Sequence, residues 1–246
     1  MTASKTFAIF LALSWFGLNS ALAQDEFDPL GESELPKNIR VQVEFIEVPE
    51  ETMTELLYGP KKSGNDTELR DKLQELIKAK KATMLDSQMV TARSGRKSTS
   101  ESIHEFIYPT EYAPPVVSPK KDENEKTGIF LFNPATPTAF ETRNVGSTLE
   151  IEPSIGENEE LVELRISPEI IYHTGNEVWT EVTKGEDKHR IGMPNFYTLR
   201  IQTGIAVIAG QYSLAAALSP KDDKGEADFS RKVLIFVKAD VLTIGR

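Results

Sequence analysis

The sequence predicts a β-dominated α+β domain, made of antiparallel or mixed hairpins with one or two helices packed on the sheet. Three observations lead to this fold class. Apolar and polar residues alternate with a period of two in several stretches, which is the pattern of strands with one buried face. Only one long stretch, residues 66–81, spaces its apolar residues like a helix. The 14 prolines and 15 glycines of the 246 residues separate the alternating stretches.

The first 23 residues are typical of a secretory signal peptide. Lys5 provides a basic start, residues 7–18 form an apolar core too short to span a membrane, and residues 21–23 match a small-x-small cleavage site. Gln24 is then the first mature residue, and the alternative is an uncleaved anchor. Residues 24–38 are acidic and lack periodicity, so we expect a flexible linker before a β domain over residues 39–246.

Composition excludes several classes of function. The chain has no cysteine, so disulfides, thiol catalysis and thiolate metal sites are impossible. The formal net charge is −10, and losing Lys5 with the leader makes it one unit more negative. An acidic surface repels nucleic acid and anionic lipid, so we expect neither to be attracted by charge. No small-molecule substrate is indicated.

The mature domain is expected to begin with a strand and two helices. The apolar residues of the strand over residues 39–48 are Ile39, Val41, Val43 and Phe45. A short helix follows over residues 50–58. The longer helix, residues 66–81, is expected to be capped by Asn65 or Asp66. Its apolar stripe contains Leu69, Leu73, Leu76 and Ile77. We expect this stripe to pack on the sheet rather than to bind a partner.

Three charge-rich runs without apolar anchors predict loops, and they are residues 118–127, 183–192 and 219–230. The short apolar run at residues 128–132 is open to three interpretations. It fits a buried strand, a lipid-facing segment or a contact between subunits. Phe130 and Phe132 are the candidate residues for an assembly contact.

Residues 145–172 form the hairpin around which the domain is organised. Leu149 and Ile151 alternate with polar residues before an acidic turn, and the alternation resumes after it. Pro153 restricts where the first strand can sit, because proline cannot donate to a ladder. Gly146 is expected to be structural, since a glycine within a strand pattern marks a bulge or a close backbone approach.

Three further strands complete the domain. Residues 195–203 alternate, and Gly204 is predicted to make a tight turn into a short apolar strand that ends at Gly210. Both glycines are interpreted as turn residues, because glycine tolerates positive φ. Residues 231–242 are apolar on both faces at their centre, which predicts a strand inside the sheet.

This order of motifs resembles the core domain of the secretins, the ring-forming outer-membrane channels of type II and type III secretion and type IV pilus systems. The resemblance covers roughly residues 39–242. It rests on V-x-V-E-x-I-E-V at residues 41–48, T-G-I-A-V-I-A-G at residues 203–210, a hairpin-like stretch over residues 82–108, and the closing strand. The most specific landmark is V-G-x-x-L-x-I-x-P-x-I, whose residues here include Val145, Gly146, Leu149, Ile151 and Pro153.

The resemblance implies a function by assembly. Secretin cores form rings in which hairpins of successive subunits pair, so it implies a homo-oligomer working with other secretion-system proteins. It implies a location in the periplasm or outer membrane of a Gram-negative-type bacterium. Complete secretins carry small periplasmic domains ahead of the core, and residues 24–38 leave no room for them. We therefore expect a companion protein to supply those domains.

The sequence offers no catalytic or metal-binding motif. His104, His173 and His189 lack ligand spacing. The acidic run at residues 157–160 is interpreted as a solvated hairpin tip rather than as catalytic carboxylates. A calcium site at residues 122–125 would lack the glycine-containing loop that such sites use. We therefore expect no enzyme activity, no cofactor and no metal.

Two functions remain open at this level. The first is a channel or scaffold component of an outer-membrane protein secretion or pilus export apparatus. The second is a soluble periplasmic β domain, derived from a secretin core, that forms no channel. One face of the central hairpin is charged, through Glu150, Glu152, Glu163 and Arg165. A charge facing lipid costs about 2–4 kcal/mol, so this face must meet water in either case.

Overall fold

The computed structural model describes residues 37–57, 64–120, 129–156, 159–184, 187–222 and 225–243. The description omits the side chains of residues 117–120, 129–133, 182, 184, 187 and 188. The predicted signal peptide and residues 24–36 of the predicted linker lie outside the described residues. In chain order the elements are β1 (Asn38–Pro49), α1 (Glu50–Leu57), α2 (Thr67–Lys78), β2 (Thr83–Arg93), β3 (Ser98–Ala113), β4 (Val116–Lys120), β5 (Ile129–Asn133), β6 (Thr136–Ile155), β7 (Leu161–Lys184), β8 (Asp187–Arg200), β9 (Thr203–Ile208), β10 (Tyr212–Leu218) and β11 (Arg231–Leu242).

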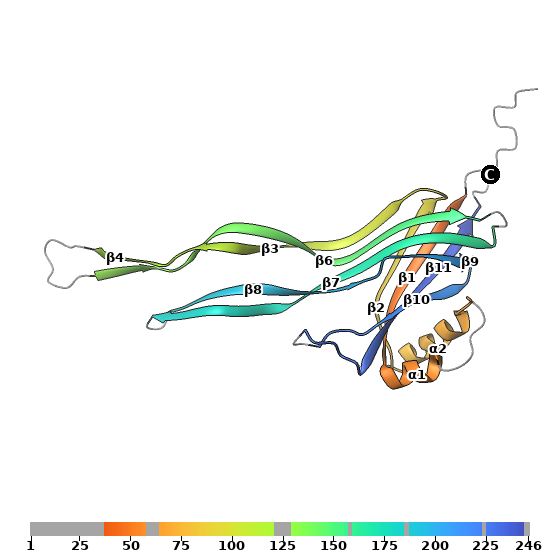
Figure 1. Cartoon of the computed structure of the whole chain (residues 1–246), viewed down its shortest axis with the longest axis horizontal. Coiled ribbons are helices and arrows are strands. Elements are labelled where there is room, and N and C mark those ends of the chain that lie inside the picture. The colour runs from red at the N-terminus through yellow and green to blue at the C-terminus, as the bar shows by residue number, and fades with distance from the viewer. Residues whose placement is uncertain are drawn as a thin grey trace, which may run out of the picture. The chain divides into compact units, whose positions relative to one another are not determined.

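The predicted fold class is confirmed, because two antiparallel sheets and two helices make up the main body of the described domain (Figure 1). Sheet A has the order β10-β11-β1-β2. Its central pair, β1 and β11, runs in register from Asn38 opposite Leu242 to Pro49 opposite Arg231. The prediction that residues 231–242 form an interior strand is confirmed. Strands that are apolar on both faces need cover on both sides, and sheet A receives it from two different layers.

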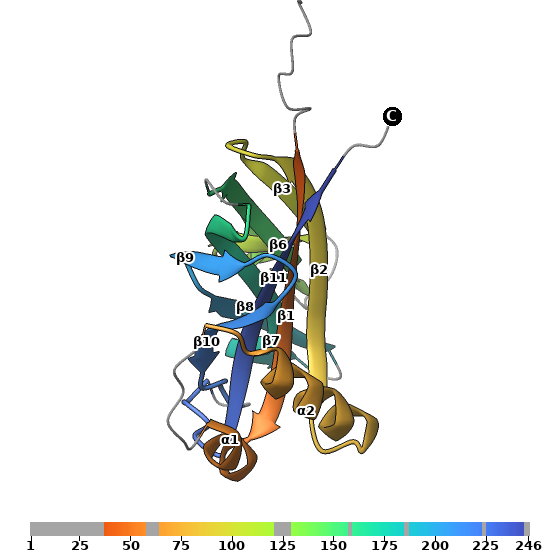
Figure 2. The ribbon, with the colours of Figure 1, turned by 90° about the vertical axis from the view of Figure 1, so that its right-hand side faces the viewer.

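Helices α1 and α2 cover one face of sheet A, and Figure 2 shows both helices at the end where β1 finishes. Leu69 and Leu73 of α2 are buried against the sheet, so the predicted packing of the helical stripe is confirmed. The Asn65 side-chain oxygen accepts a hydrogen bond from the Thr67 backbone N–H at 2.9 Å. The Asp66 carboxylate accepts one from the backbone N–H of Leu214, which fastens the start of α2 to β10.

A buried ion pair lies between α2 and sheet A. The Arg70 guanidinium donates to the Glu44 carboxylate, and Glu44 is 3% exposed. Arg70 also donates to the Gln74 side-chain oxygen and stands over the Tyr212 ring. A buried charge is tolerated where an opposite charge or a hydrogen-bond partner lies beside it. Here the arginine comes from the helix and the glutamate from the sheet, so each charge has its partner across the helix–sheet boundary.

Sheet B has the order β3-β6-β7-β8, and β9 follows β8 in line along β7, pairing with its first residues. One part of sheet B packs on the second face of sheet A and encloses the larger core. Leu149 and Ile151 of β6 meet Val41 and Val43 of β1 in this cluster. We call sheet A, the two helices and this part of sheet B the base. Along sheet B the base ends where Gly146 pairs with Ile171, because β6 and β7 do not pair beyond that point.

Past this limit the two hairpins of sheet B continue separately (Figure 1). We call residues 103–145 the β3–β6 arm, which carries the small β4–β5 ladder within it, and residues 172–198 the β7–β8 arm. Every fully buried apolar side chain among the described residues belongs to the base. The arms therefore hold their backbone by hairpin pairing and lack a core of the kind seen in the base.

Two predicted local structures are wrong. Residues 82–108 do not form a hairpin, because β2 pairs with β1 in sheet A whereas β3 pairs with β6 in sheet B. The turn at Gly95 exists, with φ of +72°, but it carries the chain from one sheet to the other. Residues 183–192 are not a loop, since β7 reaches Lys184 and β8 begins at Asp187. Backbone pairing at a hairpin tip needs no apolar anchor, so a charged sequence did not reveal it.

The other two predicted loops have different outcomes, since one lies partly in a strand and partly outside the described residues, and the other connects two strands. Residues 118–120 belong to β4, and residues 121–128 lie outside the described residues. Residues 219–230 do connect β10 to β11, with a single bridge between Lys221 and Ala227.

Candidate assembly surface

Gly146 stands at the point where sheet B divides. Its φ is +129°, a conformation that side chains rarely adopt, and an added Cβ would overlap the backbone carbonyl oxygen of Ser102. It faces Ile103 on β3 and Ile171 on β7 in the last row that all three strands share. Glycine at this place allows β3 and β6 to approach closely while the arms diverge.

The other residues of the sequence motif line up along β6 from this point into the base. Val145 is half-buried and lies opposite His104. Leu149 and Ile151 are fully buried in the core between the sheets. Pro153 lies beyond the last residue of β6 that pairs with β3, where no ladder needs its missing N–H, and its carbonyl accepts the Gly95 N–H at 2.8 Å.

The two C-terminal glycines differ in conformation. Gly210 has φ of +79° and lies in the turn between β9 and β10. Gly204 lies inside β9, paired with Arg165 of β7, so its predicted role in a tight turn is wrong. The chain does not reverse before it, because β8 and β9 both run antiparallel to β7 and follow one another in the same direction across residues 201–202.

Phe130 and Phe132, the predicted assembly contacts, belong to β5. The structure describes the backbone of this strand, which pairs with β4, but the two side chains lie outside the described residues. Their role in assembly stays a prediction.

An aromatic cluster connects the two arms. The Phe106 ring of β3 stacks on the His173 imidazole of β7 at 4.5 Å between centroids and meets the Phe196 ring of β8 edge-on at 5.8 Å. Tyr108 also approaches Phe196, at 5.7 Å, and Arg143 of β6 stands over the Phe196 ring. One side of the cluster comes from the β3–β6 hairpin and the other from the β7–β8 hairpin.

This cluster joins the arms through side chains where the sheet no longer makes hydrogen bonds. His173 also contacts the Asn176 side-chain oxygen through Nε2 at 3.0 Å, which fixes the plane of its ring. Aromatic pairs contribute about 0.5–1.5 kcal/mol beyond their buried area, so a few of them can hold two hairpins together without a ladder. Sequence reasoning treated His173 only as a metal candidate and did not identify the cluster. The alternation of Phe106 with Tyr108 was its only sequence signal.

Sheet B ends in two unpaired edges. Among the described residues β3 pairs only with β6, and β8 pairs only with β7. The outer edges of β3 and β8 therefore present backbone donors and acceptors that no described strand satisfies. Beside β8, residues Lys221 and Asp222 line a hollow of about 430 Å³ together with residues 195–198. Phe229, in the same connection, is 70% exposed.

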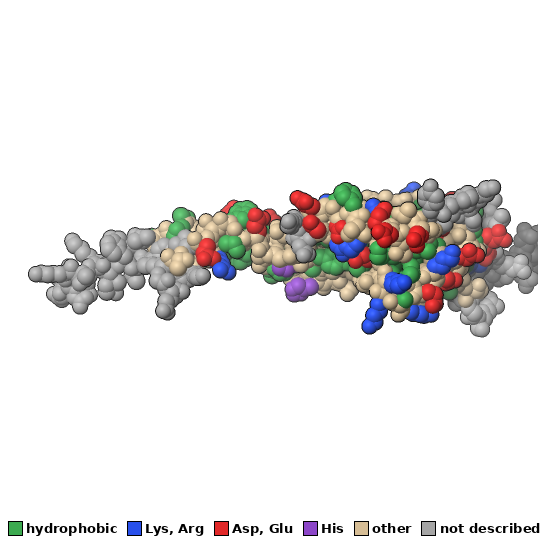
Figure 3. Space-filling view, turned by 90° about the horizontal axis from the view of Figure 1, so that it is seen from below, with side chains coloured by type: hydrophobic (Ala, Val, Ile, Leu, Met, Phe, Trp, Pro, Cys, Tyr) green, Lys and Arg blue, Asp and Glu red, His purple; other side chains and the backbone are tan. Residues whose placement is uncertain are grey.

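The face of sheet B turned away from sheet A is charged, as the sequence predicted. Its charges pair across strands, with Lys97 and Glu150 at 2.7 Å and Arg165 and Glu152 at 3.6 Å. Two hollows of about 470 and 450 Å³ lie on this face and share Glu152, Arg165 and Gly204. Charged side chains also crowd the underside of the base and are sparse toward the arms (Figure 3). A water-filled setting suits a face of this kind.

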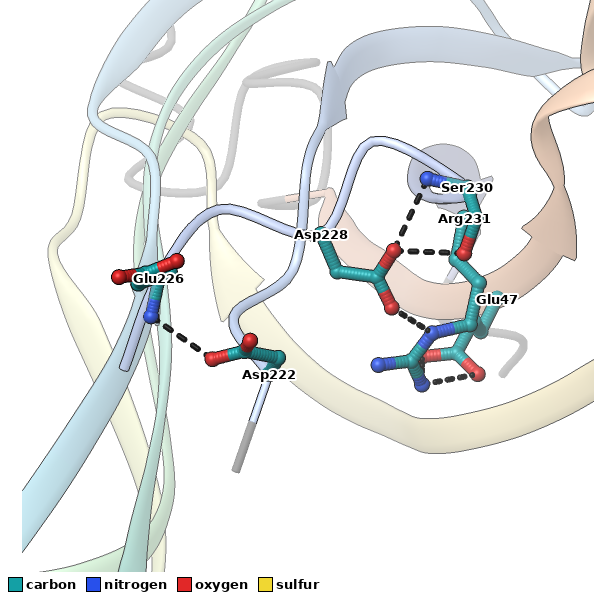
Figure 4. A network of polar contacts seen from close by, with 6 residues as sticks. All are labelled: Glu47, Asp222, Glu226, Asp228, Ser230 and Arg231. Atoms are coloured by element: carbon teal, nitrogen blue, oxygen red, sulfur yellow. Dashed lines mark hydrogen bonds and ion pairs between the residues drawn. The ribbon is translucent and has the colours of Figure 1, made fainter. Parts of the chain in front are cut away.

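A polar network fixes the connection from β10 to β11 (Figure 4). The Asp228 carboxylate accepts hydrogen bonds from the Ser230 backbone N–H at 2.9 Å, the Ser230 hydroxyl at 2.6 Å and Arg231 Nε at 2.7 Å. The hydrogen bond from the Ser230 hydroxyl, then that from Arg231 and then that from the Ser230 backbone N–H lower the pKa of Asp228 from 3.8 to about 2. Arg231 also binds both carboxylate oxygens of Glu47 on β1, at 3.1 and 3.0 Å.

The described part of the chain contains no cluster of three or more His, Cys, Asp or Glu residues able to hold a metal ion. Neither of the two described helices is long and apolar enough to cross a membrane.

Several solved structures of secretins are similar to this chain. The type III secretion injectisome secretin InvG of Salmonella shares 8% identity at a TM-score of 0.45, over 86% of this chain and 66% of that chain. The type II secretin GspD of enteropathogenic Escherichia coli shares 12% sequence identity at a TM-score of 0.41. The match covers 86% of this chain and 71% of the GspD chain. The type IV competence pilus secretin PilQ of V. cholerae shares 10% sequence identity at a TM-score of 0.36. The match covers 85% of this chain and 62% of the PilQ chain.

This chain spans slightly less than two thirds of the InvG chain. No family model and no curated protein matches the sequence.

Proposed function

We propose that this chain is a secretin-like component of an outer-membrane protein secretion or pilus export apparatus. It acts by assembling with copies of itself into a channel or scaffold, alongside other proteins of the apparatus. The ordered sequence motifs support the family, and the signal-like leader supports export. The site of action is the periplasm or outer membrane.

The observation that carries this proposal is the contrast between a closed base and open arms. The base buries its apolar residues without help from a partner. The arms carry the unpaired edges of β3 and β8, and an exposed edge strand is a template for pairing with another chain. Natural proteins protect such edges unless the edge serves to pair with another chain. If neighbouring subunits paired through these edges, no edge would remain open to aggregation, and the joined sheets would form a continuous wall.

Exposed apolar side chains on the arms support the same function. Ile107 and Phe140 of the β3–β6 arm are 64% and 60% exposed, and Trp179 of the β7–β8 arm is 66% exposed. Trp179 occupies a bulge, where β7 has an extra residue between Val178 and Thr180. A partner or lipid would cover apolar side chains that are exposed to this extent.

Cell fractionation followed by sizing in detergent tests the proposal. The expected result is a heat-resistant species of high mass in the outer-membrane fraction. A monomer confined to the periplasmic extract would overturn it and favour the soluble β domain. The leader is tested in the same experiment, because the exported chain should begin at Gln24 when its N-terminus is sequenced.

A further inference from the structure

The end of the connection from β10 to β11 is fastened to sheet A (Figure 4). Arg231 donates to the Asp228 carboxylate, which lies in the connection, and to the Glu47 carboxylate on β1. The Ser230 carbonyl oxygen accepts a hydrogen bond from the Glu50 backbone N–H at 2.8 Å. These bonds hold the end of the connection at the place where β1 passes into α1.

The start of the connection is held to its end. The Asp228 backbone N–H donates to the Pro220 carbonyl oxygen at 2.8 Å. Lys221, the next residue, forms the bridge to the returning side of the connection. The described residues of the connection, 219–222 and 225–230, therefore belong to a loop that is closed on itself and anchored in sheet A.

The connection also reaches the first residues of the β7–β8 arm. Lys221, Asp222 and Gly225 line the hollow of about 430 Å³ together with residues 195–198 of β8. The Tyr197 hydroxyl oxygen is buried and lies beside the Lys221 backbone. A loop anchored in sheet A thus contacts the strand that begins the return of the arm into the base.

The β7–β8 arm has a joint beside this hollow. β7 has one extra residue, Thr174, between His173 and Gly175, and such a bulge bends the strand and interrupts the ladder. Gly175 has φ of +131°, and no atom lies within 4 Å of an added Cβ, so neighbouring groups do not confine the backbone there. Thr174 lines the hollow, as do Thr198 on the base side of the bulge and Glu177 on the arm side.

The ladder of sheet B does not fix the direction of the β7–β8 arm. Among the described residues β6 and β7 do not pair beyond Gly146 and Ile171, so the arm leaves the sheet at that row. Farther out, the aromatic cluster around Phe106 and Phe196 joins this arm to the β3–β6 arm, which is also outside the base. The direction of the arm relative to sheet A therefore depends on contacts at its first residues, where the connection lies.

We propose that the connection from β10 to β11 is a brace that sets the inclination of the β7–β8 arm on the base. The Asp228–Arg231–Glu47 network anchors the brace, and the bulge at Thr174 is the joint about which the arm turns when the anchor is released. The proposal concerns contacts within one chain, so it does not depend on the proposed function.

A distance measurement on the full chain tests the brace, and the absence of native cysteine makes the labels specific. Spin labels are attached at Met89→Cys on β2, where the native side chain is 58% exposed, and at Thr183→Cys, which is exposed near the tip of the arm. Labelled chains are mixed with an excess of unlabelled chains, so that pulsed electron paramagnetic resonance reports distances within one chain. A single narrow distance distribution is expected for the labelled chain without further substitution.

Asp228→Asn should release the anchor and make the distance distribution about twice as wide, because the arm then turns at its joint. Glu226→Gln is the matched control. It makes the same change of charge in the same connection, at an exposed side chain outside the anchor, and should leave the width unchanged. Glu47→Gln weakens the anchor from β1 and should widen the distribution in the same way. This variant decides the test if Asp228→Asn does not fold.

Hydrogen exchange gives a second measurement. In Asp228→Asn, peptides covering residues 172–178 should exchange about tenfold faster or more, as expected for the loss of a charge-assisted hydrogen bond, while peptides of β1 are unchanged. If the folded anchor variants keep the narrow distribution and the slow exchange of the unsubstituted chain, the connection is not a brace. A distribution that is already wide in the unsubstituted chain would also overturn the proposal.

Discussion

The base and the arms of this domain are built from the same four strands of sheet B, yet they are stabilised in different ways. In the base, sheet B packs on sheet A, and residues such as Ile151 and Leu164 are almost completely buried. In the arms, the strands are held by hairpin ladders and by the aromatic cluster around Phe106 and Phe196. Among the described residues the fully buried apolar side chains lie in the base, and the arms have none. A buried core therefore stabilises one region, whereas backbone pairing and a few aromatic contacts stabilise the other.

The largest expected effect is at Gly146, on the boundary between the two regions. Gly146→Ala should cost about 2–6 kcal/mol of unfolding free energy, about 1–3 from strain at positive φ and about 1–3 from the overlap with the Ser102 backbone. Gly175, in the β7–β8 arm, is the matched control. Its φ is +131° but nothing lies within 4 Å of an added Cβ, so Gly175→Ala should show only the strain of about 1–3 kcal/mol. Chemical denaturation of both variants measures the difference, and equal losses would refute the close approach at Gly146.

Core truncation should separate the regions next. Leu73→Ala removes a fully buried side chain beneath sheet A and should cost about 2–5 kcal/mol. Ile107→Ala removes a side chain that is 64% exposed on the β3–β6 arm, and it should change the unfolding free energy of the monomer by less than about 0.5 kcal/mol. Urea unfolding of both variants tests this. A large loss for Ile107→Ala would mean that the arm is packed against something in the isolated chain.

The aromatic cluster offers a smaller and local effect. Phe106→Ala removes the stacking on His173 and the edge-on contact with Phe196, and each broken aromatic pair should lower the free energy of opening between the arms by about 0.5–1.5 kcal/mol. The two pairs together give about 1–3 kcal/mol, so hydrogen exchange of arm peptides should become roughly 5- to 150-fold faster, while exchange in the base is unchanged. Phe140→Ala is the control, because Phe140 is on the same hairpin but 60% exposed. Equal acceleration in both variants would remove the cluster as the link between the arms.

The base was more predictable from the sequence than the arms, for a physical reason. Alternating or helical burial leaves a pattern in the chain, so β1, the stripe of α2 and the strands around Leu149 were all foreseen. Residues 183–192 have no buried face, and their hairpin pairing therefore left no pattern to read. The separation of β2 from β3 was missed because a glycine turn looks the same whether the chain returns to its own sheet or crosses to another.

The proposed assembly surface was predictable only in part. The motif containing Gly146 marked the right region, and its alternation placed charge on the exposed face of the hairpin. The identity of the two edge strands depends on the pairing of four strands, and the sequence did not assign β3 and β8 to one sheet.

The smallest expected effect concerns the base alone and depends on pH. Asp228 has a pKa of about 2 in the folded chain against 3.8 ordinarily, so the folded state favours its ionised form. The stabilisation is complete above about pH 4 and is lost as pH falls through about 2, because protonation ends the charge-assisted bonds from Ser230 and Arg231. Between these pH values the melting temperature of the wild type should fall more steeply than that of Asp228→Asn. Ser230→Ala removes one hydrogen-bond donor to Asp228. In this variant the acid-induced fall of the melting temperature should therefore begin at a higher pH than in the wild type. Parallel curves for the wild type and Asp228→Asn would show that this network does not couple acid to the stability of the base.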